Sequence, residues 1–170
     1  MFVESLCVLD VAPMKIIQKK CRQYPNINYT SIDIKSPLAM FNMDITDLKF
    51  PDNNFDCIMC YHVLEHLPDD LTAMKELFRV LKPGGWAILQ VPIFGEKTFE
   101  DKNIMTPEER EKVFGDQDHV RKYGRDYKNK LENLGFHVKV DHFAIELGEA
   151  MIRKYGLLST ENIYFSMKPE

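Results

Sequence analysis

The chain has 170 residues, of which 45% are hydrophobic and 28% charged, and its formal net charge is −4 at pH 7. This size and composition fit one compact domain with its own core, which we place over residues 1–170. The acidic balance gives no field that attracts nucleic acid, and no apolar run reaches the roughly 20 residues of a membrane helix, so we expect neither partner. The N-terminus lacks the basic start and cleavage site of a signal peptide, which favours a cytoplasmic protein.

Apolar runs of strand length alternate with segments of helical periodicity along most of the chain. The expected elements are, in order, strands at 7–11, 27–34, 37–50 (a short strand and a loop), 55–61, 86–91, 136–143 and 163–167, and helices at 16–22, 68–81, 127–134 and 146–156, with a further helix starting at 106. Alternation of this kind is typical of a doubly wound α/β sheet, with helices on both faces.

Residues 50–92 are the most regular part of this pattern. A short apolar strand is followed by a helix whose apolar residues, among them Met74 and Leu77, recur at helical spacing. The run Lys82-Pro83-Gly84-Gly85 should end this helix, because proline cannot continue it and glycine accepts the positive φ of a C-terminal cap. A second buried strand then completes a strand–helix–strand crossover, the unit of a parallel sheet.

The amino-acid sequence of this crossover resembles that of a known family. The runs FDCIMCYHVLEHLPDD and RVLKPGGWAI, with CVLDV before them, a second strand ending in Asp33 and the segment FNMDI, are similar to class I S-adenosylmethionine-dependent methyltransferases, especially the small-molecule branch called type 11. The resemblance implies a Rossmann-like, mostly parallel seven-stranded sheet whose last strand is antiparallel. It also implies an enzyme that uses S-adenosylmethionine as its cofactor.

The same resemblance assigns the cofactor contacts to the ends of the strands. An acid such as Asp33, which lies 23 positions after Asp10, is close to the spacing of about 20 expected for a ribose-binding carboxylate. Asp10 would hold the amino end of the methionine moiety, and Asp44 would accept from the adenine amino group. The predicted cofactor-binding residues are Asp10, Ala12, Asp33, Ile34, Asp44, Ile45, Cys60 and Tyr61, the last two through their backbone.

One departure from the family lies directly after the first strand. Relatives carry a GxGxG loop there, whereas this chain has Ala12-Pro13-Met14-Lys15 and no glycine before Gly84. Glycines let the backbone pass close to a cofactor and adopt positive φ. Their absence keeps an alternative open, a non-catalytic methyltransferase-like domain that acts as a binding or interaction module. A nicotinamide-dependent oxidoreductase would need GxGxxG at this point, so we set that class aside.

The end of the fourth long strand carries the candidate bases. His62 and His66 are predicted to be catalytic, because an imidazole pKa near 6.5 suits proton abstraction at neutral pH; the alternative for His66 is packing against the next loop. On a helix, His62, Glu65 and His66 would share one face and could bind zinc. Relatives that hold a cation use a more acidic version of this stretch, so we predict no metal.

Residues 94–126 are polar and long for a connection, and we expect them to form an acceptor-side insert. Basic and aromatic residues gather near its end, and we predict that His119, Arg121 and Tyr123 bind the acceptor. If this stretch is helical, Arg121 and Arg125 share a face and could clamp a phosphate or carboxylate. The alternative is a salt-bridged surface.

Together these observations predict methyl transfer from S-adenosylmethionine to a small-molecule acceptor. The sequence begins almost at the first strand, without the N-terminal helices that often cover the cofactor in this family. The side of the cofactor cleft that those helices would cover could be covered by a second subunit, so the sequence leaves a homodimer open.

Overall fold

The computed structural model describes residues 5–170; residues 1–4, part of the N-terminus that we expect not to be a signal peptide, lie outside the described residues. The strands are β1 (Leu6–Val11), β2 (Ile27–Asp33), β3 (Phe41–Asn42), β4 (Phe55–Tyr61), β5 (Leu81–Gln90), β6 (Phe99–Glu100), β7 (Arg121–Lys122), β8 (His137–Asp141) and β9 (Ile163–Met167). The helices are α1 (Lys15–Cys21), the 3-10 turn η1 (Leu64–His66), α2 (Asp70–Val80), α3 (Pro107–Phe114), α4 (Tyr127–Glu132), α5 (Phe143–Glu146) and α6 (Glu149–Tyr155).

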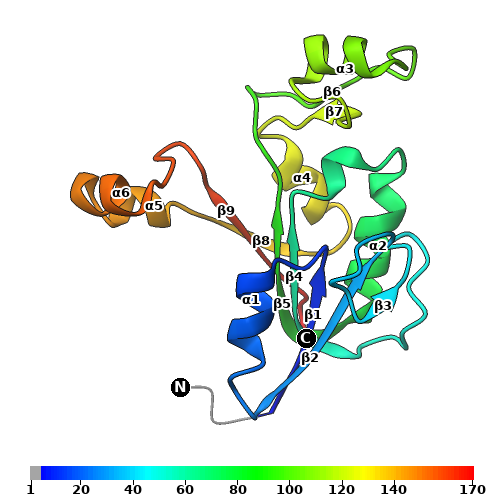
Figure 1. The fold of residues 1–170 in the computed structure, drawn as a ribbon, viewed down its shortest axis with the longest axis vertical. Helices are drawn as coiled ribbons and strands as arrows, with labels where there is room; N and C mark the ends of the chain where they lie inside the picture. The colour runs from blue at the N-terminus through cyan, green and yellow to red at the C-terminus, as the bar shows by residue number, and fades with distance from the viewer. Residues whose placement is uncertain (1–4) are drawn as a thin grey trace.

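Seven strands form one sheet in the order β3-β2-β1-β4-β5-β9-β8 (Figure 1). β1 pairs in parallel with β2 and β4, and β5 continues the parallel part, whereas β9 is antiparallel to both β5 and β8. The predicted fold class, a mostly parallel seven-stranded sheet with an antiparallel last strand, is confirmed. The chain leaves β1 toward β2 and later returns toward β4, so the switch point where ligands bind in such sheets lies between β1 and β4.

Both faces of the sheet are covered. Leu9 and Ile58 point to the side of α2 and α4, where most of the buried apolar residues gather. Val8 and Cys57 point to the other side, together with Tyr29 and the α1 residue Cys21. Figure 1 shows α1 on one side of the sheet and α2 on the other. The predicted placement of helices on both faces is confirmed.

The end of α2 differs from the prediction. The helix ends at Val80, and Leu81 already has an extended backbone and opens β5, which runs through Lys82–Gly85. Leu81 is fully buried and pairs with Phe55 of β4. Because Leu81 already belongs to the sheet, the helix ends before the glycines and they do not cap it. Gly85 is needed for a different reason: a Cβ there would lie 2.8 Å from the carbonyl oxygen of Lys82.

Residues 94–126 form a small unit beyond the end of the main sheet, where β6 pairs with β7 and α3 packs above them (Figure 1). Thr106 caps α3 through a reciprocal capping box with Glu109, as the predicted start at Thr106 implies. Arg121 lies in β7, so the predicted helical face shared by Arg121 and Arg125 is wrong. The predicted helix at 146–156 is also interrupted, because Gly148 adopts φ +78° between α5 and α6.

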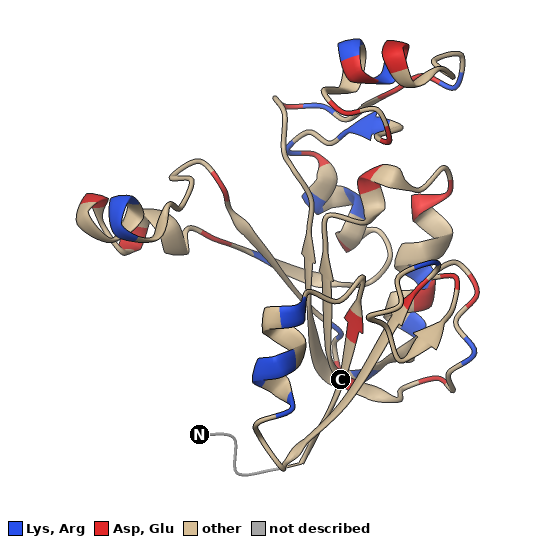
Figure 2. Ribbon diagram, viewed as in Figure 1, with Lys and Arg blue, Asp and Glu red and all other residues tan. Residues whose placement is uncertain are grey.

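Charged residues of both signs are distributed over the whole fold, and α3 and α6 carry both (Figure 2). Helix α1 carries lysines and no acid, whereas the short helix α5 carries Glu146 and no basic residue. No helix among residues 5–170 is long and apolar enough to cross a membrane.

A buried carboxylate joins the small unit to the main sheet. Asp70, in the first turn of α2, is 4% exposed and accepts a hydrogen bond from the Tyr123 hydroxyl at 2.5 Å. Lys130 of α4 donates to the same oxygen at 2.5 Å, and the Arg121 guanidinium lies 3.6 Å from it. Burial, and then the charge of Asp70, raise the pKa of Tyr123 far above its ordinary value, so the phenol remains the proton donor.

A second buried carboxyl lies under α1. Asp10 is 2% exposed and accepts a hydrogen bond from the Tyr29 hydroxyl at 2.6 Å. Burial raises the pKa of Asp10 from 3.8 to about 6, although the hydrogen bond from Tyr29 acts in the opposite direction. Folding therefore favours the protonated form of this carboxyl.

We predict that Asp70→Asn lowers the free energy of unfolding by about 3 kcal/mol, because it leaves Lys130 without its buried counter-ion and Arg121 with only the half-exposed carboxylate of Glu100. Asp47→Asn is the matched control, since the ion pair of Asp47 with Lys49 is exposed, and its effect should stay within about 0.5 kcal/mol. Urea unfolding measures both. Equal effects of the two substitutions would contradict the role given to Asp70.

Asp10 should make stability depend on pH. Between pH 4 and about 6 the folded chain binds more protons at Asp10 than the unfolded chain, so this group's contribution to stability falls as pH rises through that range and is constant above it. We predict that the free energy of unfolding of Asp10→Asn, measured relative to that of the parent chain, rises by about 3 kcal/mol between pH 4 and pH 6. Urea unfolding at a series of pH values measures the difference. Parallel stability curves for the two proteins would contradict it.

Candidate functional site

A cavity lies at the carboxyl ends of β1 and β2. Five of the predicted cofactor-binding residues line it, one after β1, two at the end of β2 and two after β3. The lining residues are Val11, Ala12, Ile32, Asp33, Ile34, Met43, Asp44, Ile45, Val63 and Leu67. The sequence analysis missed Met43, Val63 and Leu67, which supply apolar wall. The structure thus brings Ala12, Asp33, Ile34, Asp44 and Ile45 together around one hollow.

The backbone at Ala12 adopts the conformation that glycine favours. Ala12 has φ +53°, and its N–H donates to the carbonyl oxygen of Ile32 at 2.9 Å. A residue with a Cβ costs roughly 1–2 kcal/mol in this region. The missing glycine therefore changes the sequence of the loop without removing its left-handed turn.

Two carboxylates at the cavity are fixed by their own loops. Asp33 Oδ1 accepts from the backbone N–H groups of Lys35 and Ser36, both at 2.7 Å. Asp44 Oδ1 accepts from the backbone N–H and the hydroxyl of Thr46, both at 2.8 Å. These bonds hold each side chain in place and use one oxygen of each carboxylate, so the second oxygen is the one that a ligand would meet.

Asp10 and Cys60 do not line this cavity. Asp10 contacts Tyr29 inside the protein, so its side chain does not reach the hollow in this arrangement. Cys60 is fully buried in the core on the α2 side, and burial raises the pKa of its thiol far above the ordinary value. The contact of its backbone with a cofactor stays a prediction. Tyr61, whose pKa burial raises to about 12, borders a second hollow beside β4 and β5.

That second hollow and an adjoining one share His62, Gln90, Leu158 and Glu161. We call the two together the β4–β5 cleft. Its wall on the side of α5 is apolar, and its other end reaches the start of the 94–126 unit. The apolar wall is formed by Met14, Tyr61, Ile88, Phe143, Leu157, Leu158 and Ile163.

His62 follows β4 directly and has φ +54°. Its N–H donates to the carbonyl oxygen of Gln90 at 2.9 Å, and its side chain is half exposed. Nδ1 lies 3.2 Å from Oε1 of the buried Glu65, while Nε2 lies 3.8 Å from Oε1 of Glu161. A buried carboxylate thus orients the ring, and the other ring nitrogen faces the cleft.

Gln90 and Glu161 were not singled out from the sequence. Gln90 is 5% exposed, and its side-chain N–H group donates to the carbonyl oxygen of Asn162 at 2.8 Å. Its Oε1 has no hydrogen-bond partner within residues 5–170. A polar side chain at the end of an otherwise apolar strand is the signal that could have identified Gln90. Glu161 sits in a loop before β9 and gave no comparable signal.

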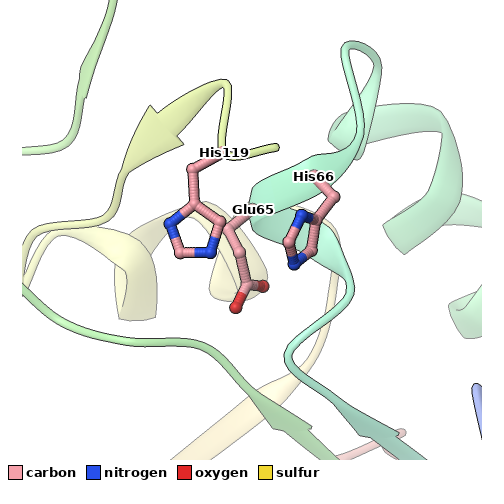
Figure 3. Close-up of side chains that lie close together, drawn as sticks. All are labelled: Glu65, His66 and His119. Atoms are coloured by element: carbon pink, nitrogen blue, oxygen red, sulfur yellow. The ribbon is translucent and has the colours of Figure 1, made fainter. Parts of the chain in front are cut away.

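His66 does not join His62 in the cleft. Its ring lies edge-on to that of His119, with 4.7 Å between ring centroids, and the Glu65 side chain lies between them in Figure 3. Burial, and then the charge of His66, lower the pKa of His119. The two imidazoles that were predicted for different roles, a base and an acceptor contact, are therefore neighbours.

The other predicted acceptor residues are used inside the protein. Arg121 is 3% exposed, and its guanidinium donates to the carbonyl oxygens of Leu64, Leu67 and Pro68. Tyr123 is fully buried and donates to Asp70. We predicted that Arg121 and Tyr123 bind the acceptor, whereas in the structure both side chains bind other groups of the protein. Neither lines the β4–β5 cleft.

Residues 5–89, half of the chain, match the model of the methyltransferase domain family. Among curated proteins, the chain is 46% identical over 48 residues to a sterol 24-C-methyltransferase of Aspergillus fumigatus and 38% identical over 66 residues to a demethylmenaquinone methyltransferase of Bacillus licheniformis. The matches cover 28% and 36% of this chain but only 13% and 28% of those relatives.

Among solved structures, a complex of the Haloferax volcanii Trm112 methyltransferase activator with a methyltransferase aligns with a TM-score of 0.66 and 18% identity, covering 98% of this chain and 84% of that one. At this identity the likeness shows the fold alone. The family match and the order of the strands agree with this fold. The chain belongs to the class I S-adenosylmethionine-dependent methyltransferases.

Proposed function

We propose that the chain transfers a methyl group from S-adenosylmethionine to a small molecule with a largely apolar body. The observation that carries this proposal is the pair of neighbouring hollows. The cavity beside β1 and β2 carries the residues that would hold a nucleoside, and the β4–β5 cleft offers apolar walls and an imidazole. Both lie at the carboxyl ends of the parallel strands, where open α/β sheets bind their ligands.

The residues of the first cavity fit the cofactor. Asp33 would accept from the ribose hydroxyls through the oxygen that its loop leaves free, and Asp44 would accept from the adenine amino group. Ile34 and Ile45 line the same hollow and would pack against the adenine faces. The turn at Ala12 lets the backbone approach the methionine moiety. When bound, S-adenosylmethionine supplies an electrophilic methyl group that is activated by its sulfonium.

The β4–β5 cleft would hold the acceptor. His62 Nε2 faces it and can take the proton that an acceptor hydroxyl or amine loses when its heteroatom gains the methyl group. Glu65 orients the ring through Nδ1, and the free Oε1 of Gln90 can accept a hydrogen bond from the acceptor. The names of the sterol and demethylmenaquinone relatives agree with an apolar acceptor.

The non-catalytic alternative rested on the missing glycines. The left-handed turn at Ala12 argues against it, because the loop has the shape that glycines would allow. The segment 94–126 remains a proposed acceptor-side insert, with Phe94 and Gly95 at the edge of the cleft. Whether a homodimer covers the cleft, and the absence of a nucleic-acid partner, stay predictions.

We predict that the chain binds S-adenosylmethionine and S-adenosylhomocysteine. Asp33→Asn should lower the affinity for each ligand by roughly 10- to 100-fold, as expected for lost hydrogen bonds to a charged group. The asparagine oxygen can still accept from Lys35 and Ser36, so the loop should keep its shape. Isothermal calorimetry measures the affinities, with Asp47→Asn as the control. No heat from the parent chain with either ligand would favour the non-catalytic domain.

We predict that His62→Gln lowers kcat by roughly 10²- to 10⁴-fold, the usual contribution of a general base, and leaves cofactor affinity unchanged. Transfer of a labelled methyl group to a panel of apolar phenols and quinols measures the rate. His137→Gln, an exposed histidine on β8, serves as the control and should keep the parent activity. Full activity of His62→Gln would rule out the proposed base.

A further inference from the structure

Three side chains that can ligate metal meet beside the cleft. Glu65 and His66 belong to η1, and His119 lies in the loop before β7. One ligand atom of each, a carboxylate oxygen and two ring nitrogens, lies within 4.8 Å of the others. Figure 3 shows the Glu65 carboxylate between the two imidazole rings, with all three side chains converging on the same space.

The fold holds the two segments together through several bonds. The N–H of Val120 donates to the carbonyl oxygen of Glu65 at 2.9 Å, directly beside His119. The Arg121 guanidinium donates to the carbonyl oxygen of Leu64 at 2.8 Å and is itself close to Asp70. The three side chains are therefore brought together by structure that is independent of any ligand.

Polar atoms at this point lack partners. Glu65 is 1% exposed, and its Oε2 has no hydrogen-bond partner within residues 5–170. Nδ1 of His119 is also buried and without a partner in the described chain, on the side of the ring away from Glu65 in Figure 3. A buried carboxylate oxygen is costly unless a donor or a cation satisfies it, and buried polar side chains in native proteins nearly always have such a partner.

We propose that Glu65, His66 and His119 form a binding site for a divalent transition-metal ion, with zinc as the best match. Two imidazole nitrogens and one carboxylate oxygen are a ligand set that zinc prefers. Magnesium and calcium take oxygen ligands, so two histidines disfavour them. Three protein ligands leave a fourth tetrahedral position for water or a bound molecule.

The ligand atoms need only a modest rearrangement to bind zinc. Bonds of about 2.0–2.2 Å in a tetrahedron separate ligand atoms by roughly 3.4 Å. The rings of His66 and His119 are only partly buried and can rotate toward the fixed Glu65 carboxylate. This set differs from the His62, Glu65, His66 spelling of the sequence: His62 turns to the cleft, and His119 takes its place.

The metal site would be linked to His62 through Glu65. Oε1 of Glu65 faces His62 Nδ1 at 3.2 Å, while Oε2 is the oxygen without a partner. One carboxylate would therefore bind the ion with one oxygen and orient the cleft imidazole with the other. Removing the ion would loosen the hold on His62 without touching the cavity beside β1 and β2.

The test is a zinc titration of the untagged full chain after treatment with a chelator. We expect one zinc ion per chain with a micromolar or lower dissociation constant by calorimetry, and a visible absorption spectrum of tetrahedral form when cobalt replaces zinc. His66→Gln and His119→Gln should each weaken zinc binding by at least roughly tenfold. His137→Gln, on the exposed side of β8, should bind as the parent does.

No zinc binding by the folded parent chain at 100-fold excess, or equal affinities in the parent and in both ligand variants, would overturn the proposal. Glu65→Gln changes a buried residue and can disturb folding, so the two histidine variants carry the test, with circular dichroism as the check of their fold. Because the titration contains no S-adenosylmethionine, its failure would leave the proposed methyl transfer untouched.

Discussion

The arrangement of the site depends on the buried carboxylate of Asp70. Tyr123 and Lys130 donate to it and Arg121 lies beside it, so the adjacent segments of β7 and α4 meet the first turn of the distant helix α2. Burying this many charged groups is costly unless each is paired, and the network satisfies them mutually. Because Arg121 also binds the carbonyl oxygens of the turn after β4, Asp70 indirectly fixes the position of Glu65 and His66.

Backbone strain gathers at the same end of the sheet. Ala12 follows β1 and His62 follows β4, and both adopt positive φ although neither is glycine. These neighbouring strands flank the switch point, and non-glycine residues in the left-handed region are concentrated at functional sites. Ala12 lines the cavity beside β1 and β2, and His62 lines the β4–β5 cleft. Each of these two strained residues therefore lies at a candidate binding site.

Much of the sheet could be predicted from the sequence, because buried parallel strands are short apolar runs between polar segments. Phe55–Tyr61 and Ile163–Met167 have the predicted bounds for this reason. The start of β5 at Leu81, in place of the predicted Trp86, could not be predicted from local signals, since the pairing of Leu81 with Phe55 extends the strand through the nearby proline and glycines. Such tertiary pairing is invisible to a rule that reads a few neighbouring residues.

The candidate site was predictable where it follows strand ends and unpredictable where it depends on long-range contacts. Asp33, Asp44 and Ala12 come together because parallel strands end at one edge. Arg121 was predicted to bind the acceptor, yet its partners are carbonyl oxygens of the distant turn after β4 and the carboxylates of Asp70 and Glu100. His119 could not be placed beside His66 without the bond between Val120 and Glu65, which joins the polar segment to the end of β4.

Glu65 connects these parts chemically. It is buried, and its Oε1 faces the imidazole of His62, whereas its Oε2 has no partner in the described chain. One oxygen of the same carboxylate lies within 4.8 Å of ring nitrogens of His66 and His119. Hydrogen bonds from His62 alone leave Oε2 unsatisfied. A cation at that oxygen would hold the carboxylate in place, so the orientation of the His62 ring would depend on whether the second position is occupied.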